Sequence, residues 1–586
     1  MSNLLQIKNI SKTYTGDVIL SDVSFTVGEK KKIGVIGRNG AGKSTLFRII
    51  TGTEKQTEGE IVIFDKTRIG YIEQEEDFSE TETVIGYLLR KTKREDWECR
   101  KVAATFQLKN DLIEKKVRDL SGGYQMRVKL VAMILHEPNL LLLDEPTNYL
   151  DLSTMFLLEK FLLSYKGAYM IISHDKEFLA SVCKEIVEIE SGEAYYFRGS
   201  LEAFFTFKKE KLETTIKFNK KQDKKQKHLQ SFVDRFRYKA SKAKQAQSKL
   251  KQLEKIEKQI IKANQKNISL HVPDVKVKNG LAIRMNGLEM GYGDKLVVKT
   301  SEMDIEKGEH IAILGDNGQG KTTFMRTIAG DLEKMNGRMR WMPHMEIAYY
   351  AQHLIDALNF QEKVGAYLEA RSGAKTKEDV IRVASSLLFS QSDLEKTVSV
   401  LSGGEKARLC LAGLLLSGAN VLLLDEPTNH LDFETVEVLI NALKKSKATI
   451  LFISHNRTFI NSLADKIIEV KNGGVKRFGS SYDDYIFTIK KQVDIEVEVR
   501  ADEEEKREVK RRRREVFEEN KHIRNQIQKI EKKLDKCKLR KQEILDIFES
   551  NPTQENMELS RELKDINENS VDFENKWLEL NSKIFD

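Results

Sequence analysis

The sequence predicts an α/β fold that is built twice, with a helical hairpin between the two α/β domains and a second, coiled-coil hairpin after them. The first observation behind this prediction is that two long blocks carry the same short motifs in the same order. The second is that apolar, β-branched runs alternate with amphipathic stretches inside each block. The third is that the segments between and after the blocks are highly charged and almost free of Gly and Pro, which favours long solvated helices.

Length and composition exclude several classes of protein. The 586 residues are enough for several domains, and 40% hydrophobic residues with only 6 Pro exclude a disordered or collagen-like chain. The four Cys are far apart and form no CxxC motif, so a reducing compartment is expected rather than a disulfide framework or a zinc ribbon. No apolar run approaches the ~18 residues that span a bilayer. We therefore expect a cytoplasmic protein without a membrane domain.

Equal spacing of matching residues indicates that the two blocks are copies of one domain. In each block a tyrosine stands 29 residues before the lysine of a glycine-rich loop, and a glutamate stands 29 residues before a histidine. Equal distances of this kind indicate equal local folds. The matching pairs are Tyr14 and Lys43, Tyr292 and Lys321, Glu145 and His174, and Glu426 and His455.

Apolar runs predict the buried strands of the first block at 32–36, 140–143 and 169–172. Helices are predicted directly after the glycine-rich loops, at 45–50 and 323–328. The expected domains are 1–203 for the first α/β domain, 204–278 for the linker, 279–489 for the second α/β domain and 490–586 for the C-terminal extension.

The glycine-rich loops at 37–44 and 315–322 both fit the pattern G-x-x-x-x-G-K-[ST]. In this pattern the backbone N–H groups wrap phosphates, the lysine reaches the terminal phosphates and the hydroxyl holds Mg²⁺. A strand before and a helix after each loop place the phosphate at a helix N-terminus. The loops therefore predict two sites for ATP and Mg²⁺, with candidate residues Gly37, Asn39, Gly40, Gly42, Lys43, Ser44 and Thr45, and Gly315, Asn317, Gly318, Gly320, Lys321, Thr322 and Thr323.

An acidic pair ends an apolar run in each block. Asp144 and Asp425 come first in these pairs, where a carboxylate can hold magnesium as in other P-loop nucleotidases. The glutamates that follow, Glu145 and Glu426, can accept a hydrogen bond from the water that attacks the phosphate. Recurrence at equal distances adds two catalytic candidates and two rings that stack on adenine: His174 and His455, and Tyr14 and Tyr292.

The linker concentrates the positive charge of the chain. Residues 208–250 hold 15 Lys or Arg and 4 Asp or Glu, a larger excess than the net charge of +8 of the whole chain. This stretch predicts a helix, a second helical run follows at 253–261, and Pro273 ends it. Cations interleaved with Phe and Tyr favour RNA over the alternative of a solvated helix face. The candidate RNA-binding residues are Arg235, Arg237, Lys239, Lys242, Lys244 and Lys249.

The C-terminal region carries apolar residues at helical spacing from about residue 494, and Pro552 interrupts it before a second amphipathic run. This pattern predicts a helical hairpin or short antiparallel coiled coil. Its basic run at 511–514 leaves two interpretations open, a nucleic-acid-binding hairpin and a solvated hairpin that helps folding or docking.

Leu-Ser-Gly-Gly at 120–123 and 401–404 resembles the signature of the ATP-binding cassette superfamily. Asp-Glu-Pro-Thr-Asn-x-Leu-Asp at 144–151 and 425–432 resembles its ABC-F branch, which has tandem cassettes and no membrane domain. The linker is most similar to that of the YheS-type branch, through residues 234–237 and 242–248. The first cassette lacks the arm insertion of many members. The resemblance covers essentially the whole chain and implies two tandem P-loop ABC domains.

The resemblance implies a monomer whose two cassettes associate head to tail, with each ATP between the P-loop of one cassette and the signature of the other. It also implies nucleotide and magnesium contacts for Gln74 and Gln352. Site one would then combine Lys43, Ser44, Gln74, Asp144, Glu145 and His174 with Ser402, Gly403 and Gly404, and site two would combine Lys321, Thr322, Gln352, Asp425, Glu426 and His455 with Ser121, Gly122 and Gly123.

The family further implies an ATPase that binds the ribosome with ATP in both sites, directs its linker toward tRNA near the peptidyl-transferase centre and leaves after hydrolysis. Its role would be that of a translation factor or of ribosomal protection in antibiotic resistance. Two other classes stay open. One is a DNA-binding ATPase that acts in recombination or repair through the C-terminal coiled coil. The other is the motor of a membrane exporter, for which no docking feature is visible.

Overall fold

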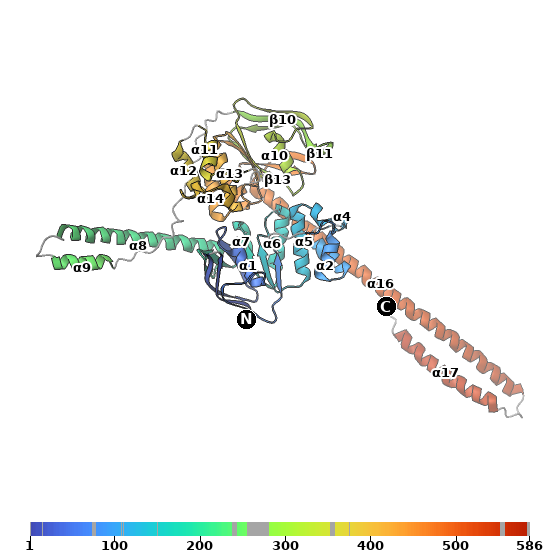
Figure 1. The fold of residues 1–586 in the computed structure, drawn as a ribbon. Coiled ribbons are helices and arrows are strands. Elements are labelled where there is room, and N and C mark those ends of the chain that lie inside the picture. The colour runs from blue at the N-terminus through green and yellow to red at the C-terminus, as the bar shows by residue number, and fades with distance from the viewer. Residues whose placement is uncertain are drawn as a thin grey trace. The chain divides into compact units, whose positions relative to one another are not determined.

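A computed structural model describes most of the chain (Figure 1). The described residues are 2–14, 16–72, 78–106, 108, 110–148, 150–236, 243–254, 280–351, 358–373, 376–429, 431–550 and 557–582. They form two compact units, Met1–Val493 and Asp494–Asp586. The first unit contains both α/β domains, here called cassette 1 (β1 to β9) and cassette 2 (β10 to β19).

Cassette 1 has a six-stranded sheet in the order β5-β6-β7-β3-β8-β9 and a three-stranded antiparallel sheet in the order β2-β1-β4. The larger sheet is parallel except for β9. Its elements are β1 Asn3–Tyr14, β2 Asp17–Gly28, β3 Lys32–Gly37, α1 Lys43–Thr51, β4 Glu58–Ile63, β5 Ile69–Ile72, α2 Val84–Thr92, α3 Asp96–Thr105, α4 Asn110–Ile113, α5 Gly122–Leu135, β6 Leu140–Asp144, α6 Leu152–Ser164, β7 Ala168–Ile172, α7 Lys176–Val182, β8 Glu185–Glu190 and β9 Glu193–Phe197.

Cassette 2 repeats this plan in one sheet with the order β12-β10-β11-β19-β18-β13-β17-β16-β15, in which β14 also pairs with β10. Parallel pairing of β11 with β19 joins the parts that stay separate sheets in cassette 1. Its elements are β10 Leu281–Tyr292, β11 Lys295–Thr300, β12 Met303–Glu306, β13 His310–Leu314, α10 Lys321–Ala329, β14 Asn336–Trp341, β15 Ile347–Tyr350, α11 Val364–Arg371, α12 Lys377–Ser386, α13 Gly403–Ser417, β16 Val421–Asp425, α14 Phe433–Lys445, β17 Thr449–Ile453, α15 Arg457–Leu463, β18 Lys466–Lys471 and β19 Gly474–Phe478.

The central strands explain why the apolar runs could be read from the sequence. Strands β6 and β16 are buried at every position, including the aspartate that ends each of them. A parallel strand covered on both faces has no solvent side, so its sequence is a continuous apolar run. The predicted strands are confirmed as β3, β6 and β7, and the predicted helices after the glycine-rich loops are confirmed as α1 and α10.

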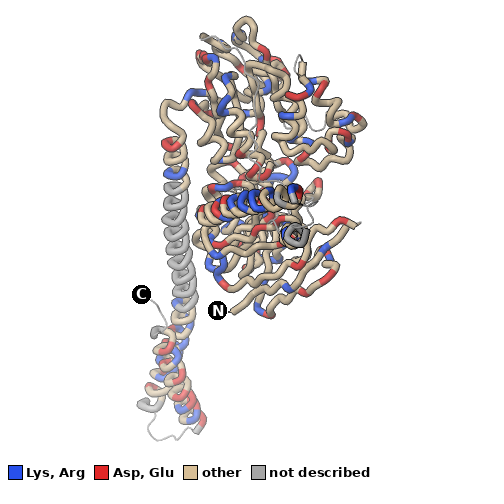
Figure 2. Tube along the Cα trace, turned by 90° about the vertical axis from the view of Figure 1, so that its left-hand side faces the viewer, with Lys and Arg blue, Asp and Glu red and all other residues tan. Residues whose placement is uncertain are grey.

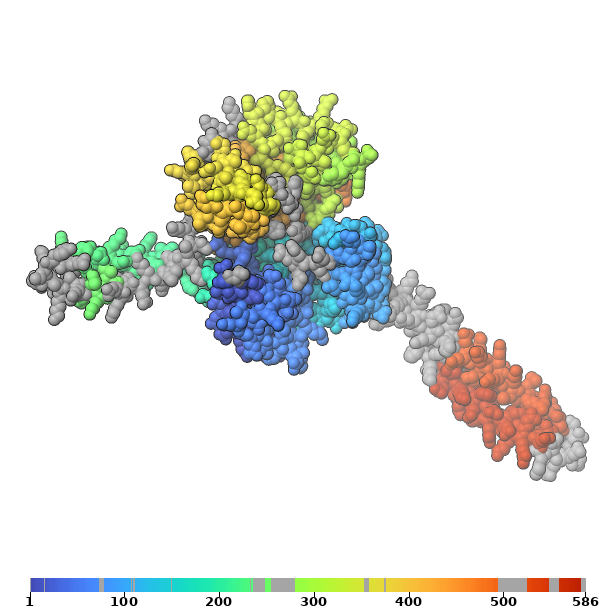
Figure 3. Space-filling view, in the orientation of Figure 1, coloured from blue at the N-terminus to red at the C-terminus, as the bar shows by residue number. Residues whose placement is uncertain are grey.

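The linker forms two helices, α8 Leu201–Phe236 and α9 Ala243–Glu254. The described atoms of α9 pack beside α8 (Figures 1 and 3), which confirms a helical hairpin. The single helix expected over 208–250 is wrong, because α8 stops at Phe236 and a separate helix starts at Ala243. The helix α9 is in contact with α8, an arrangement that one uninterrupted helix could not make, and Leu229 and Val233 of α8 are buried. The run expected at 253–261 lies almost wholly outside the described residues.

The second unit is a hairpin of the two C-terminal helices, α16 Tyr482–Ser550 and α17 Met557–Ser582, of which α16 begins in the first unit. Arg540 Nε lies 2.9 Å from Glu562 Oε1, and Trp577 Nε1 donates to Glu531 Oε1 at 3.1 Å. Contacts in this order show that α17 runs antiparallel to α16, as the sequence predicts. In the described part of the chain, no helix is long and apolar enough to cross a membrane.

Candidate nucleotide-binding sites

Each glycine-rich loop links a buried strand to a helix, and the lysine at its end donates hydrogen bonds to carbonyl oxygens at the start of the same loop. Lys43 Nζ donates to the carbonyl oxygens of Gly37 at 2.8 Å and Arg38 at 3.0 Å. Lys321 Nζ donates to the carbonyl oxygens of Gly315 at 2.7 Å and Asp316 at 3.1 Å. Burial lowers the pKa of both lysines, while the nearby carboxylates oppose this shift. Each ammonium is thus a buried cation at a helix N-terminus, an arrangement that attracts anions.

The first glycine of each loop leaves no room for a side chain. Gly315 has a φ of +149°, and a Cβ added there would lie 2.2 Å from the carbonyl oxygen of Val470 on β18. At Gly37 the corresponding distance to Ile189 on β8 is 2.4 Å. These loops therefore need glycine in order to pass so close to a neighbouring strand.

Gly315→Ala is expected to displace the loop of cassette 2, to abolish binding of a fluorescent ATP analogue there and to lower the unfolding midpoint. The control is Gly330→Ala, at the end of α10, where φ is +82° but nothing lies within 4 Å of an added Cβ. That control should lower the free energy of unfolding by about 1–2 kcal/mol, the cost of a left-handed backbone for a residue with a Cβ. Equal unfolding midpoints and equal nucleotide binding for the two variants would refute the prediction.

Each acidic pair is held at the end of its strand by a left-handed glutamate. Glu145 has a φ of 49° and Glu426 one of 52°, and their N–H groups donate to the carbonyls of Ile172 and Ile453, both at 2.9 Å. This backbone costs about 1–2 kcal/mol for a residue with a Cβ, so the packed surroundings must enforce it. The preceding aspartates, Asp144 and Asp425, are buried.

A histidine faces each glutamate. His174 Nε2 lies 3.3 Å from Glu145 Oε1, and His455 Nε2 lies 3.4 Å from Glu426 Oε1. Burial raises the pKa of Glu145 and of Glu426 to about 8, because the charged form loses hydration. Burial and the charge of Lys321 lower the pKa of His455 to about 3. Both predicted glutamate and histidine pairs are therefore together in space.

Hydroxyl contacts fix the histidine loops to the acidic loops. The Oγ of Ser173 lies 2.8 Å from Thr147 Oγ1, and the Oγ of Ser454 lies 3.0 Å from Thr428 Oγ1. The sequence reasoning assigned no role to the two threonines. Their recurrence at the same place in both blocks was a signal that could have found them.

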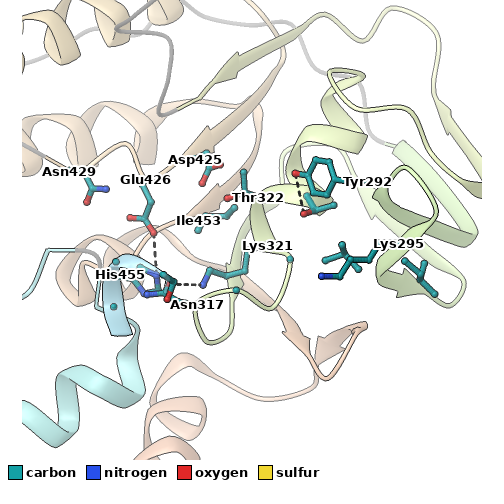
Figure 4. Close-up of a pocket in the computed structure, with 18 residues that line it drawn as sticks. Tyr292, Lys295, Asn317, Lys321, Thr322, Asp425, Glu426, Asn429, Ile453 and His455 are labelled. Atoms are coloured by element: carbon teal, nitrogen blue, oxygen red, sulfur yellow. Dashed lines mark hydrogen bonds and ion pairs between the residues drawn. The ribbon is translucent and has the colours of Figure 1, made fainter. Parts of the chain in front are cut away.

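One cavity of about 670 Å³ is lined by residues of both cassettes (Figure 4). Its lining combines the signature residues at the start of α5 with the loop lysine and acidic pair of cassette 2. In the described part of the chain, Ser121 Oγ has no hydrogen-bond partner although it is buried. The lining consists of Ser121, Gly122, Gly123, Tyr292, Lys295, Leu296, Val297, Asn317, Gly318, Gly320, Lys321, Thr322, Thr323, Asp425, Glu426, Asn429, Ile453 and His455. The two cassettes thus face each other head to tail at this cavity.

Contacts across the cassettes continue at the neighbouring loops. Asp151 Oδ2 accepts from the N–H of Asn317 at 3.1 Å, and Ser153 Oγ donates to Asp316 Oδ1 at 2.6 Å. The sequence reasoning included Asp151 in a motif without giving it a role. The signal was an aspartate that follows Asp144 and Asp425 by seven residues in both blocks.

The opposite pair of loops meets through charge. Arg38 Nε lies 3.4 Å from Glu434 Oε2. In the duplicated sequence, Arg38 corresponds to Asp316 and Glu434 corresponds to Ser153. Here Ser402 is the N-cap of α13, and its Oγ both donates to Glu405 Oε2 at 2.7 Å and accepts from the N–H of Glu405. The two signature serines therefore differ in their contacts.

The two predicted adenine-stacking rings also differ. Tyr292 lines the cavity, and its Oη accepts from Thr323 Oγ1 at 3.5 Å. The hydroxyl of Tyr14 bonds to Glu54, and Lys12 Nζ lies 4.7 Å from the centroid of its ring. Both rings are exposed.

Several predicted residues lie outside the described part of the chain. They are Gln74, Gln352, Arg237, Lys239 and Lys242. Arg235 is exposed near the end of α8, Lys244 lies in α9, and Lys249 Nζ donates to Gln252 Oε1 at 3.0 Å.

Comparison with known proteins agrees with this geometry. The ABC transporter family model matches residues 20–148 and 298–429, and a second ABC transporter model matches residues 187–272, which include α8 and α9. YdiF of Bacillus subtilis is 32% identical, with 86% of this chain and 85% of that protein aligned. ABC transporter F family member 2 of Arabidopsis thaliana is 31% identical, with 86% and 82% aligned.

The YheS-type resemblance is also confirmed, since YheS of Escherichia coli K12 is 31% identical, with 80% of this chain and 79% of that protein aligned. Among solved structures, the archaeal ribosome recycling factor aABCE1 in complex with stalk protein aP1 shares the fold, with a TM-score of 0.58, 20% identity and 82% and 92% of the chains covered. Paired cassettes, a helical extension between them and relatives aligned over most of their length place this chain in the ABC-F family of tandem ATP-binding cassette proteins.

Proposed function

We propose that this chain is a ribosome-associated ATPase that closes its cassettes around two ATP molecules and releases the ribosome after hydrolysis. The observation that carries the proposal is the shared cavity, in which Ser121–Gly123 of cassette 1 face Lys321 of cassette 2. A nucleotide bound there would contact both cassettes. It would therefore favour the closed arrangement by its own binding energy.

The residues around this cavity fit ATP and Mg²⁺. Lys321 and the loop N–H groups would bind the phosphates, and the hydroxyl of Ser121 would add a contact from the other cassette. Thr322 and Asp425 present the hydroxyl and carboxylate oxygens that Mg²⁺ prefers, and both line the cavity. Mg²⁺ would neutralise charge on the phosphates. Ser44 and Asp144 would hold Mg²⁺ in the same way in site one.

Hydrolysis would depend on the glutamate and histidine pairs. A glutamate at the cavity wall can orient the attacking water, and the histidine Nε2 that faces it can hold the carboxylate in place. Because Glu145 with His174 and Glu426 with His455 have the same geometry, we propose hydrolysis in both sites.

The proposed contact with RNA rests on α8. Its base is fixed to cassette 1, since Leu201 and Phe204 are buried and Lys208 Nζ lies 2.5 Å from Glu188 Oε1. Beyond this base, lysines follow one another along the helix (Figure 2). Beyond residue 212, the exposed lysines in the described part of α8 are Lys217, Lys220, Lys221, Lys224, Lys225 and Lys227. Exposed lysines on a helix that leaves the cassette suit the phosphates of tRNA or ribosomal RNA. A translation factor and a ribosomal-protection protein would both use this arrangement.

Cosedimentation with ribosomes tests the proposal. The variant Glu145→Gln, Glu426→Gln should bind ATP, stay closed and accumulate in the ribosomal fraction with ATP but not with ADP. A gel shift with duplex DNA runs in parallel. Absence from ribosomes together with ATP-dependent binding to DNA would replace the proposal by the DNA-binding alternative.

A charge-reversal variant replaces four lysines of α8 by Glu: Lys220, Lys221, Lys224 and Lys225. It is expected to bind ribosomes at least about tenfold more weakly and with a weaker dependence on salt. The reason is that each lost phosphate contact reduces the slope of log K against log salt by about 0.9. The same four changes at Lys529, Lys532, Lys536 and Lys541, which are exposed on α16, serve as the control. An equal loss from both sets would show that general charge, not α8, binds the ribosome.

A further inference from the structure

A row of three rings leads from site one to the base of the linker helix. The ring centroids of His174 and Phe433 lie 5.8 Å apart with the planes at 72°, and those of Phe433 and Phe205 lie 6.3 Å apart at 82°. Edge-to-face geometry of this kind is favoured for aromatic pairs. His174 belongs to cassette 1, Phe433 to cassette 2 and Phe205 to α8. The row therefore connects three parts of the first unit.

The central ring is held in place by its surroundings. Phe433 is the first residue of α14, whose N-cap Asp432 accepts from the N–H of Thr435 at 2.9 Å. Its ring is partly buried against the hydrophobic core of cassette 1. On the far side, Lys176 Nζ lies 4.6 Å from the centroid of Phe205. Because the rings are in contact on both sides of Phe433, a shift of cassette 2 relative to cassette 1 must change the contact of Phe433 with His174, with Phe205 or with both.

The duplication gives site two no equivalent row. Asp151 corresponds to Asp432, so Leu152 stands where Phe433 stands. Ser200 corresponds to Ser481, so Ile486 stands where Phe205 stands. An aliphatic side chain has no ring edge or face to offer His455. The two sites are therefore built differently at the position that faces the catalytic histidine.

We propose that Phe433 is a positioning residue of site one, which orients His174 for hydrolysis and couples the closure of site one, rather than of site two, to α8. This inference deepens the proposed function and rests on it. The ring acts through His174 and needs no contact with the nucleotide. Its loss should therefore slow hydrolysis more than it weakens ATP binding.

Single-site chains provide the test of positioning. With Glu426→Gln only site one hydrolyses ATP, and there Phe433→Leu is expected to lower kcat by roughly tenfold, since small misplacements of catalytic groups are costly, while KM stays within about twofold. With Glu145→Gln only site two hydrolyses, and the same change should leave kcat within about twofold. Phe433→Tyr should restore site one. Val436→Ala, which truncates a side chain in the cavity beside Phe433, is the control for loss of packing.

Unchanged kcat of site one in Phe433→Leu, or an equal loss from Val436→Ala, would overturn the positioning role. No hydrolysis by either single-site chain before Phe433 is changed would overturn the proposed function itself, so the two failures are distinguishable.

Amide hydrogen exchange in residues 201–212 tests the coupling. In the Glu145→Gln, Glu426→Gln chain, ATP should slow exchange at the base of α8, and Phe433→Leu or Phe205→Leu should reduce this protection by at least about half. Full ATP-dependent protection in both variants would overturn the coupling to α8, whatever the kinetics show.

Discussion

The double variant Glu145→Gln, Glu426→Gln is expected to turn over ATP at least ~100-fold more slowly than the parent chain, while ATP still binds. Glu145 is buried and Glu426 half-buried, each faces a histidine, at 3.3 and 3.4 Å, and each follows the aspartate that ends β6 or β16. A positioned general base contributes about 10²–10⁴-fold, and glutamine keeps the shape of the side chain but cannot take up a proton. Steady-state phosphate release with excess ATP measures the effect.

The single variants separate the two sites. Each of Glu145→Gln and Glu426→Gln should remove a large part of the turnover, because both sites have the same pair of residues. Glu137→Gln is the matched control, since Glu137 also has a left-handed backbone, with a φ of 50°, but is exposed. Full turnover in Glu145→Gln would contradict hydrolysis in both sites.

Arg457→Met is expected to destabilise the first unit by about 3–5 kcal/mol, the usual cost of removing one partner of a buried ion pair. Arg457 Nη2 donates to Glu159 Oε1 at 2.6 Å, and its Nε lies 3.9 Å from Asp175 Oδ2. All three side chains are buried. The pair joins α15 of cassette 2 to α6 of cassette 1. Methionine would leave two buried carboxylates without this cation, and guanidinium unfolding monitored by fluorescence would record the loss.

Two further variants show where the loss comes from. Arg457→Met with Glu159→Met removes both charges and should recover a large part of the stability, because a buried ion pair and a well-packed apolar pair often contribute similarly to the free energy of unfolding. Arg382→Met, which breaks an exposed pair with Asp379, should change stability only slightly. If Arg457→Met behaves like Arg382→Met, the interface does not depend on this pair.

Local motifs made the nucleotide sites readable before the structure was known. A glycine loop such as 315–322 is contiguous, and its function needs particular residues at particular spacings, so Gly315 and Lys321 stand out in the sequence. The duplication strengthened every such prediction. It also suggested two equal sites, whereas the structure gives Ser121 and Ser402 different contacts and places Phe433 beside His174.

The linker shows the opposite case. Its charge predicted a helix, but the point where the chain reverses depends on which turns of α8 and α9 pack together. Leu229 and Val233 of α8 are buried, and nothing in their local sequence marks these two positions for burial on a highly charged helix.

The sequence by itself determined that this chain has two phosphate-binding α/β domains of the ABC-F family, a basic helical linker and a helical C-terminal hairpin. Periodicity, glycine spacing and charge are local properties, and each is complete within a few dozen residues. Only the tertiary structure decided that Arg457 meets Glu159, that Asp316 meets Ser153 and that Phe433 stands between His174 and α8. These partners are far apart in sequence, and their contacts exist because the surfaces of two folded cassettes fit together, which no local pattern records.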